Sequence, residues 1–193
     1  MYIPKHFEVT DQEEALVFIM ANSFGQLIST VENRLFVSHL PFLVSEDGKS
    51  IICHLAKNNP QWKSIEEQEV LVTFQGSHDY ISPSWYSSPG VPTWNYQSVH
   101  IYGKPVLVTE PKKLCSIVGE LTKKYESSFE KPWNPKYKES LLNMIIGIEI
   151  QITDIQCKYK LSQNRPESDQ KQVAEQLKQK GSIELAKAMK IEL

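Results

Sequence analysis

The sequence has few cysteines, few glycines and no long apolar run. Its three cysteines, Cys53, Cys115 and Cys157, are odd in number and far apart, with no CxxC pair and no Cys/His cluster at zinc spacing. We therefore expect reduced thiols, mostly in the core. No window approaches the roughly 18 apolar residues of a membrane span, and residues 1–18 show no signal-like segment, so we expect a cytoplasmic protein without a membrane partner.

Sequence motifs of several large enzyme classes are also missing. There is no GxSxG, no P-loop and no GxGxxG after a strand. The sequence therefore does not support a hydrolase with a nucleophile elbow, a nucleotide triphosphatase or a Rossmann dehydrogenase. The acids form no persuasive catalytic pair. The sequence therefore names no catalytic residue.

Charge and histidine patterns give little support to two further kinds of site. The net charge is −2 and no run of five or six like charges occurs, so nothing marks a surface for a phosphate backbone. Four histidines lie in or beside predicted strands without the spacing of a metal site, and we interpret them as hydrogen-bonded structural residues: His39, His54, His78 and His100. A haem or metal ligand set is the alternative interpretation, but we predict no metal site.

What remains is an ordinary globular composition, 40% hydrophobic over 193 residues, with periodic segments. The patterns predict helices at 11–22, capped by Thr10, and from 111 onward, and two short C-terminal helices capped by Ser168 and Ser182 and separated by Gly181. Strands are expected at 25–30, 34–44, 49–55, 70–76, 94–108 and 146–157, with a helical turn at 60–65. Six or seven strands with peripheral helices favour a mainly β fold, a small barrel that begins as an antiparallel meander.

Two polar segments could bind an anion. In HLAKNNPQWKSI, residues 54–65, Lys57, Asn58, Asn59 and Gln61 surround the start of a predicted helical turn, where free backbone N–H groups favour phosphate. In KYKLSQNRP, residues 158–166, Arg165 offers a planar fork that can pair a phosphate or a carbonyl. Solvated loops are the alternative for both segments.

Residues 80–103, YISPSWYSSPGVPTWNYQSVHIYG, combine two Trp and four Tyr with three Pro and no acid. The prolines argue against a regular buried element before about Thr93. This stretch is predicted to be a loop that carries aromatic side chains, either as core packing or as cover for a flat ring.

Taken together, MYIPKHF, SHLPF, HLAKNNPQW, YISPSWY, VPTWNYQSVHIYG and KLSQNRP resemble the PaiB family of FMN-binding, negatively acting regulatory proteins. The match runs in order from residue 1 to about 166. The resemblance implies an FMN-binding split β-barrel like that of pyridoxamine-phosphate oxidases, over residues 1–166, with residues 167–193 as a helical extension packed on it. It also implies a homodimer with FMN at the subunit interface.

Site residues follow from the same resemblance. One subunit would line the flavin from a strand and hold its phosphate and ribityl end with the following loop, using Ser38, His39, Leu40, His54, Ala56, Lys57, Asn58, Gln61 and Trp62. The partner subunit would close the site with Trp94, Tyr96, Gln97, Ser98, His100, Gln163 and Arg165. The related oxidases place two adjacent basic residues at the phosphate, whereas here neutral Asn58 follows Lys57.

The resemblance leaves three functions open. The first is an FMN-binding protein with a negative role in transcription, acting through DNA or a protein partner. The others are a flavin-dependent oxidoreductase of unassigned substrate and a haem-binding protein on the same barrel. Lysines in residues 168–189 are largely offset by acids, so we expect weak direct DNA binding.

Overall fold

The fold is described by a computed structural model, which covers residues 1–133 and 139–191. Its strands are β1 (Glu8–Val9), β2 (Phe24–Val31), β3 (Arg34–Pro41), β4 (Leu43–Val44), β5 (Ser50–Ala56), β6 (Val70–Ile81), β7 (Thr93–Val108) and β8 (Ile145–Lys160). Its α-helices are α1 (Gln12–Ala21), α2 (Pro111–Glu126), α3 (Glu167–Lys180) and α4 (Ile183–Ala188). Short 3-10 helices η1 (Lys5–Phe7), η2 (Pro60–Glu67), η3 (Pro83–Trp85) and η4 (Glu139–Met144) connect them.

The strands form one mainly antiparallel sheet in the order β3-β2-β6-β7-β8-β5-β4, and β1 pairs with β8. Among the described residues this path does not close on itself, as expected for a split barrel. The predicted mainly β fold with peripheral helices is confirmed. The pairings predicted between neighbouring strands are present in the β2–β3 hairpin and between β4 and β5. The predicted meander is wrong at its last step, because β5 pairs with β8 and β6 pairs with β2.

The described chain divides into two compact units. One contains residues 1–15, 75–99 and 156–193, and the other contains residues 16–74 and 100–155. We call them the terminal unit and the central unit. The division into residues 1–166 and 167–193 stays a prediction.

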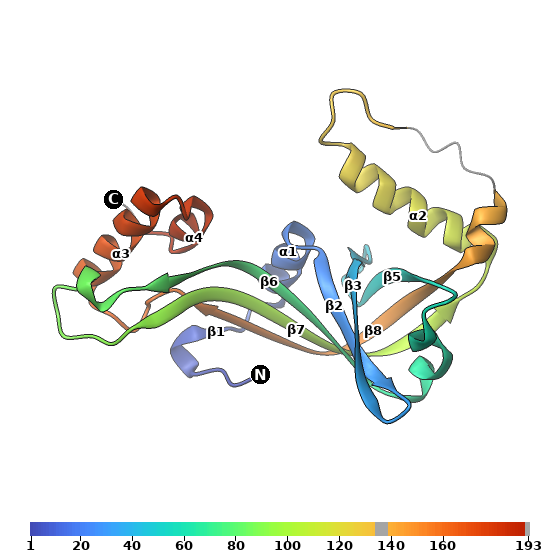
Figure 1. The fold of residues 1–193 in the computed structure, drawn as a ribbon, viewed down its shortest axis with the longest axis horizontal. Helices are drawn as coiled ribbons and strands as arrows, with labels where there is room; N and C mark the ends of the chain where they lie inside the picture. The colour runs from blue at the N-terminus through green and yellow to red at the C-terminus, as the bar shows by residue number, and fades with distance from the viewer. Residues whose placement is uncertain (134–138, 192–193) are drawn as a thin grey trace. The chain divides into compact units, whose positions relative to one another are not determined.

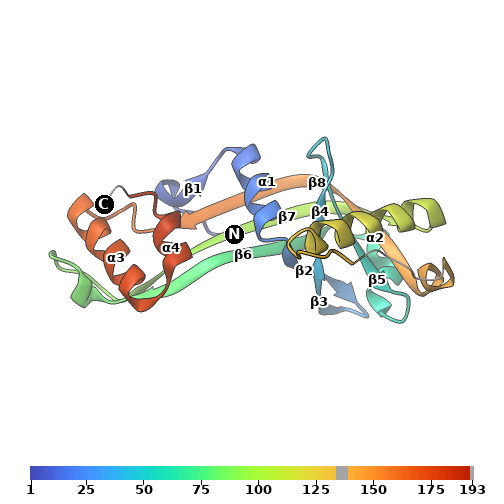
Figure 2. The same cartoon turned by 90° about the horizontal axis from the view of Figure 1, so that it is seen from above.

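The central unit contains the β2–β3 hairpin, β4, β5 and α2. The helix predicted from residue 111 is confirmed as α2, and its Leu114, Ile117 and Leu121 pack with Val108 in a buried cluster. Figure 2 shows α2 near β5, with which it is in contact. A side chain at Gly103 would lie 2.5 Å from Ile150 Cγ2, so this glycine allows β7 and β8 to approach closely.

The terminal unit holds α3 and α4 beside the ends of β6 and β7 (Figure 1). Asp79 on β6 accepts hydrogen bonds from Lys180 Nζ at 2.5 Å and from the Ser182 hydroxyl, and thereby links the strand to both helices. Gly181 ends α3 in the left-handed conformation, with a φ of 94°, as its position predicted.

Two predicted helix caps are wrong. Asp11, not Thr10, caps α1, because its carboxylate accepts from the backbone N–H of Glu13 at 2.8 Å and is the stronger acceptor. Ser168 lies inside the first turn of α3, which starts one residue earlier, directly after Pro166. Pro166 leaves the first turn without a side-chain cap.

Candidate functional site

The turn between β5 and η2 is held in place by side chains from several segments. Asn59 caps η2 by accepting from the Gln61 N–H at 3.0 Å, and its amide donates to Ser38 Oγ at 2.8 Å. Trp62 Nε1 donates to the Lys57 carbonyl at 3.0 Å, and the Lys57 N–H donates to the carbonyl of Met144 at 2.9 Å. The turn is therefore rigid at its base.

The tip of this turn is exposed. Ala56, Lys57 and Asn58 are all exposed, and the ammonium of Lys57 makes no ion pair with an acid in the described chain. An exposed cation beside the start of a helical turn is a suitable position for a phosphate. A contact from Lys57 or Asn58 to the FMN phosphate stays a prediction.

Gln61 and Trp62 have a structural role in this turn. Gln61 is completely buried, and its amide donates to the Leu27 carbonyl at 3.1 Å and to Ser29 Oγ at 2.9 Å. It therefore fastens η2 to the β2–β3 hairpin. A direct contact from either residue to FMN stays a prediction.

Sequence reasoning assigned Asn59 to the polar loop but not to the cofactor contacts. The structure shows that Asn59 joins Ser38 of β3 to this turn. The Asn-Pro pair that opens η2 is the sequence signal for such a cap.

Strand β3 presents its predicted site residues on both faces. Ser38 is buried under Asn59, Leu40 is half-buried, and His39 is exposed and stacks on Phe24 with ring centroids 6.5 Å apart. Since Gln26 pairs with His39 and Ile28 with Val37, the outward face of the hairpin carries His39 among apolar side chains.

Three buried polar atoms of the central unit lack a hydrogen-bond partner. They are His54 Nδ1, Gln61 Oε1 and His100 Nδ1, and the described residues contain no other such atom. All three residues belong to the set predicted for FMN. Buried polar atoms without a partner are rare because each costs about 1–3 kcal/mol. They fit a cofactor that offers both donors and acceptors, as a flavin ring does.

Burial also sets the charge state of both histidines. Desolvation lowers the pKa of His54 and of His100 below the usual value of 6.5. At neutral pH both rings are therefore neutral, so each has one nitrogen that donates and one that accepts. We expected His100 to come with the partner's residues, but in this chain it belongs to the same compact unit as His54.

The remaining predicted residues, Trp94, Tyr96, Gln97, Ser98, Gln163 and Arg165, belong to the terminal unit. Trp94 is 53% exposed and its ring contacts those of His78 and Tyr80 at centroid distances of 6.4 and 6.2 Å. Gln163 uses its amide within its own loop, accepting from Leu161 N–H and donating to the Tyr159 carbonyl. Cover of a flavin by these residues stays a prediction.

The predicted aromatic loop is partly strand. β6 runs to Ile81 and β7 begins at Thr93, so the connection carries only η3 and the residues after it. Trp85 and Tyr86 are both half-buried there. They are neither fully exposed nor part of the fully buried core.

The cysteines, possible metal ligands and possible membrane-spanning helices are the remaining features to consider. Cys53 and Cys157 are buried and Cys115 is exposed. Within the described ranges, no group of three His, Cys, Asp or Glu is arranged to hold a metal ion. No helix in the described part of the chain is long and apolar enough to cross a membrane.

Two solved structures with the same fold are a flavocytochrome and a FAD and heme binding protein. The flavocytochrome Anf3 of Azotobacter vinelandii superposes with a TM-score of 0.67 at 16% identity, covering 82% of this chain and 72% of its own. The FAD and heme binding protein of Mycobacterium smegmatis gives a TM-score of 0.63 at 11% identity, covering 79% and 73%. At these identities the likeness establishes the fold, a split barrel of the flavoprotein type.

Sequence comparison then identifies the family. The family model described as "Putative FMN-binding domain" matches residues 1–154. Protease synthase and sporulation protein PAI 2 of Bacillus subtilis is 46% identical over 185 residues, which cover 92% of this chain and 89% of that protein. The chain belongs to this FMN-binding family, and FMN is the cofactor that the family assigns to it. The predicted resemblance to the PaiB family is confirmed.

Proposed function

We propose that this chain is an FMN-loaded homodimer with a negative regulatory role in transcription. The observation that carries the flavin site is the set of three unpartnered buried atoms, on His54, Gln61 and His100. All three fall within the residues assigned to FMN from the sequence. When bound, FMN supplies one- and two-electron redox chemistry.

The chain's own residues bind and orient the cofactor in this proposal. Lys57 pairs with the phosphate in front of η2, and Asn59 and Trp62 keep the turn in shape. His54 and His100, both neutral, give the ring system hydrogen-bonding nitrogens in a dehydrated environment. Because neutral imidazoles carry no charge, they can bind an uncharged ring without the free-energy cost of removing a charge from water.

The exposed face of the β2–β3 hairpin supports the homodimer. Phe24, Leu35 and Val37 are 65%, 80% and 45% exposed, and the pairing register places them on one face of the hairpin. β3 is also at one end of the sheet order. A large exposed apolar face on an end strand is typical of an interface. We propose that a second copy covers this face, which also carries His39.

The phosphate contact is tested by Lys57→Glu. The substitution places a negative charge against the phosphate, so we expect FMN affinity to fall by at least about tenfold. Quenching of flavin fluorescence measures it. Lys63→Glu is the matched control, because Lys63 is an exposed lysine of the same unit, and it should bind FMN like the wild type. Equal affinity in Lys57→Glu and wild type would remove Lys57 from the site.

The regulatory role rests on the PaiB-type sequence and on the sporulation-related name of the Bacillus subtilis relative. We propose that it acts through a protein partner or a flavin-dependent signal. The chain has 21 Lys and Arg against 23 Asp and Glu. On the C-terminal helices, Lys171 pairs with Glu167 and Lys187 pairs with Glu184. These pairs reduce the positive charge available to DNA phosphates.

A DNA titration separates the two routes to regulation. We expect only weak binding to a promoter fragment near physiological salt, with little change when the charges of Lys171 and Lys178 are reversed. Submicromolar binding with a steep salt dependence, lost on that reversal, would instead assign regulation to direct DNA contact.

A further inference from the structure

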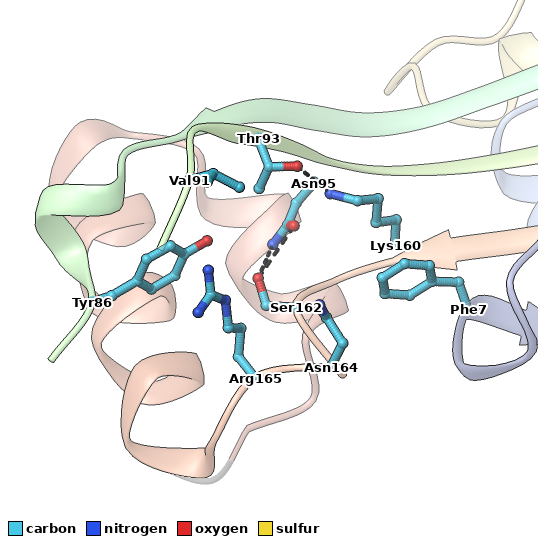
Figure 3. Close-up of a pocket in the computed structure, with 9 residues that line it drawn as sticks. All are labelled: Phe7, Tyr86, Val91, Thr93, Asn95, Lys160, Ser162, Asn164 and Arg165. Atoms are coloured by element: carbon cyan, nitrogen blue, oxygen red, sulfur yellow. Dashed lines mark hydrogen bonds between the residues drawn. The ribbon is translucent and has the colours of Figure 1, made fainter. Parts of the chain in front are cut away.

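The terminal unit contains a cavity in which Arg165 is the one lining residue that also belongs to the set predicted for FMN. It has a volume of about 120 Å³, well above the roughly 10–15 Å³ that a single water requires. Its described lining combines the two cations Lys160 and Arg165 with hydroxyl, amide and aromatic groups and includes no acid. Figure 3 shows Lys160 and Arg165 on opposite sides of the Asn95–Ser162 pair.

Both cations are held in position by neutral groups. The Arg165 guanidinium lies 4.1 Å from the centre of the Tyr86 ring and donates to the Pro89 carbonyl at 3.0 Å. Lys160 Nζ donates to Thr93 Oγ1 at 2.5 Å and to the Trp94 carbonyl at 2.6 Å. Neither cation makes an ion pair with an acid in the described chain. Two oriented positive charges therefore face the cavity uncompensated.

A third cation adds to this excess of positive charge. Burial lowers the pKa of Lys160, and the nearby charge of Lys158 lowers it further. Lys158 is buried and donates to the carbonyl of Tyr2 at 3.0 Å, and it too lacks an acidic partner in the described ranges. A bound anion would relieve this repulsion.

The wall of the cavity is preorganised by hydrogen bonds and backbone conformation within the chain. Asn95 is completely buried and its amide donates to Ser162 Oγ at 2.9 Å, while Ser162 itself has a φ of 69°, in the left-handed region. Strained backbone of this kind is concentrated at functional sites. A side chain at Gly90 would lie 2.3 Å from Tyr86 Cδ2 and 2.6 Å from Arg165 Nη2, so glycine lets the loop pack closely against the stacked Tyr86 ring and guanidinium.

Asp169 of α3 anchors that loop. Its carboxylate accepts from the Ser87 N–H at 2.9 Å and from the Ser87 and Ser88 hydroxyls at 2.7 and 2.6 Å. These hydrogen bonds, led by that from Ser88, lower the pKa of Asp169. Asp169 is the buried acid nearest to Arg165 in the sequence, and its carboxylate is used in these hydrogen bonds to the loop.

We propose that this cavity binds a small oxyanion, a carboxylate or a phosphate group, through Arg165 and Lys160. The planar guanidinium can pair two oxygens of either group, and Lys160 supplies a second charge. Tyr86 and Phe7 form an aromatic wall beside it. The residues of this site belong to the terminal unit and Lys57 belongs to the central unit. In this proposal Arg165 holds the small anion and not the flavin.

The experiment is a calorimetric titration of the full chain with inorganic phosphate and, separately, with acetate, at constant ionic strength. We expect saturable binding of at least one of them, weakened about tenfold or more in Arg165→Gln and in Lys160→Gln. The preferred anion distinguishes a phosphate site from a carboxylate site. Lys178→Gln is the matched control, since it removes one exposed positive charge from the same unit, and it should bind like the wild type.

Two further measurements separate this proposal from the flavin assignment. Arg165→Lys retains the charge but loses the fork, and should bind the anion more weakly than wild type while unfolding at the same temperature. FMN affinity should be unchanged in both Arg165 variants. Three results would overturn the proposal. The Arg165 variants could lose FMN affinity while they still bind the anion as the wild type does. Lys178→Gln could weaken anion binding as much as the Arg165 variants do, or neither anion could show saturable binding to the wild type.

Discussion

At the residue scale, His54 and His100 are half-buried histidines of the predicted flavin site. Each has a buried Nδ1 atom without a hydrogen-bond partner, in a family that binds a heteroaromatic cofactor. The sequence singled out both residues by resemblance but gave no indication that these atoms would be buried or that the rings would be neutral. Their burial depends on strands that pair across long sequence separations, and no local pattern encodes it.

The lowered pKa values predict a pH dependence of stability. A histidine whose folded pKa lies below its unfolded value contributes stability that is complete above about pH 6.5 and is lost as the pH falls toward the folded pKa. Each such group contributes a slope of at most about 1.4 kcal/mol per pH unit. Urea unfolding between pH 7.5 and 5 should therefore show falling stability, with a shallower fall in His54→Gln.

Exposed His6 provides the control for this measurement. His6→Gln is the same substitution at an exposed histidine and should keep the slope of the wild type. A His54→Gln protein with the wild-type slope would contradict the assignment of burial at His54.

At the element scale, the sequence predicted which segments form strands but not all of their partners. The strand predicted at 146–157 and the helical turn predicted at 60–65 are both present, as β8 and η2. Pairing of β5 with β8 joins residues almost a hundred positions apart, and the amphipathic pattern of either strand is compatible with several neighbours. Likewise, nothing local indicated that Gln61 would turn inward to the hairpin while Lys57 remained outside.

The hairpin face yields a prediction at this scale. Val37→Asp places a charge in the proposed interface and should convert the dimer into a monomer, as measured by light scattering at tens of micromolar protein. Val17→Asp is the control, because Val17 lies on α1 and is 54% exposed, which is similar to the 45% exposure of Val37. A Val37→Asp protein that remains dimeric would place the interface elsewhere.

At the scale of the whole molecule, the two sets of predicted flavin residues belong to different compact units, except for His100, which belongs to the same unit as the first set. Sequence resemblance supplied both sets and assigned them to opposite subunits of a dimer. The sequence does not show whether the site is built by one subunit or completed by its partner, because the two subunits of a homodimer have the same sequence. The stoichiometry of the loaded protein therefore decides the central proposal.

The most direct measurement is gel filtration of the protein after addition of FMN, with absorbance and light scattering recorded on the eluted peak. We predict a peak with the mass of two chains, one FMN per chain and the visible bands of an oxidised flavin. A monomeric peak that retains FMN would contradict the shared site. A peak without flavin, or one that takes up added haem and shows a Soret band in place of flavin absorbance, would contradict the cofactor assignment itself.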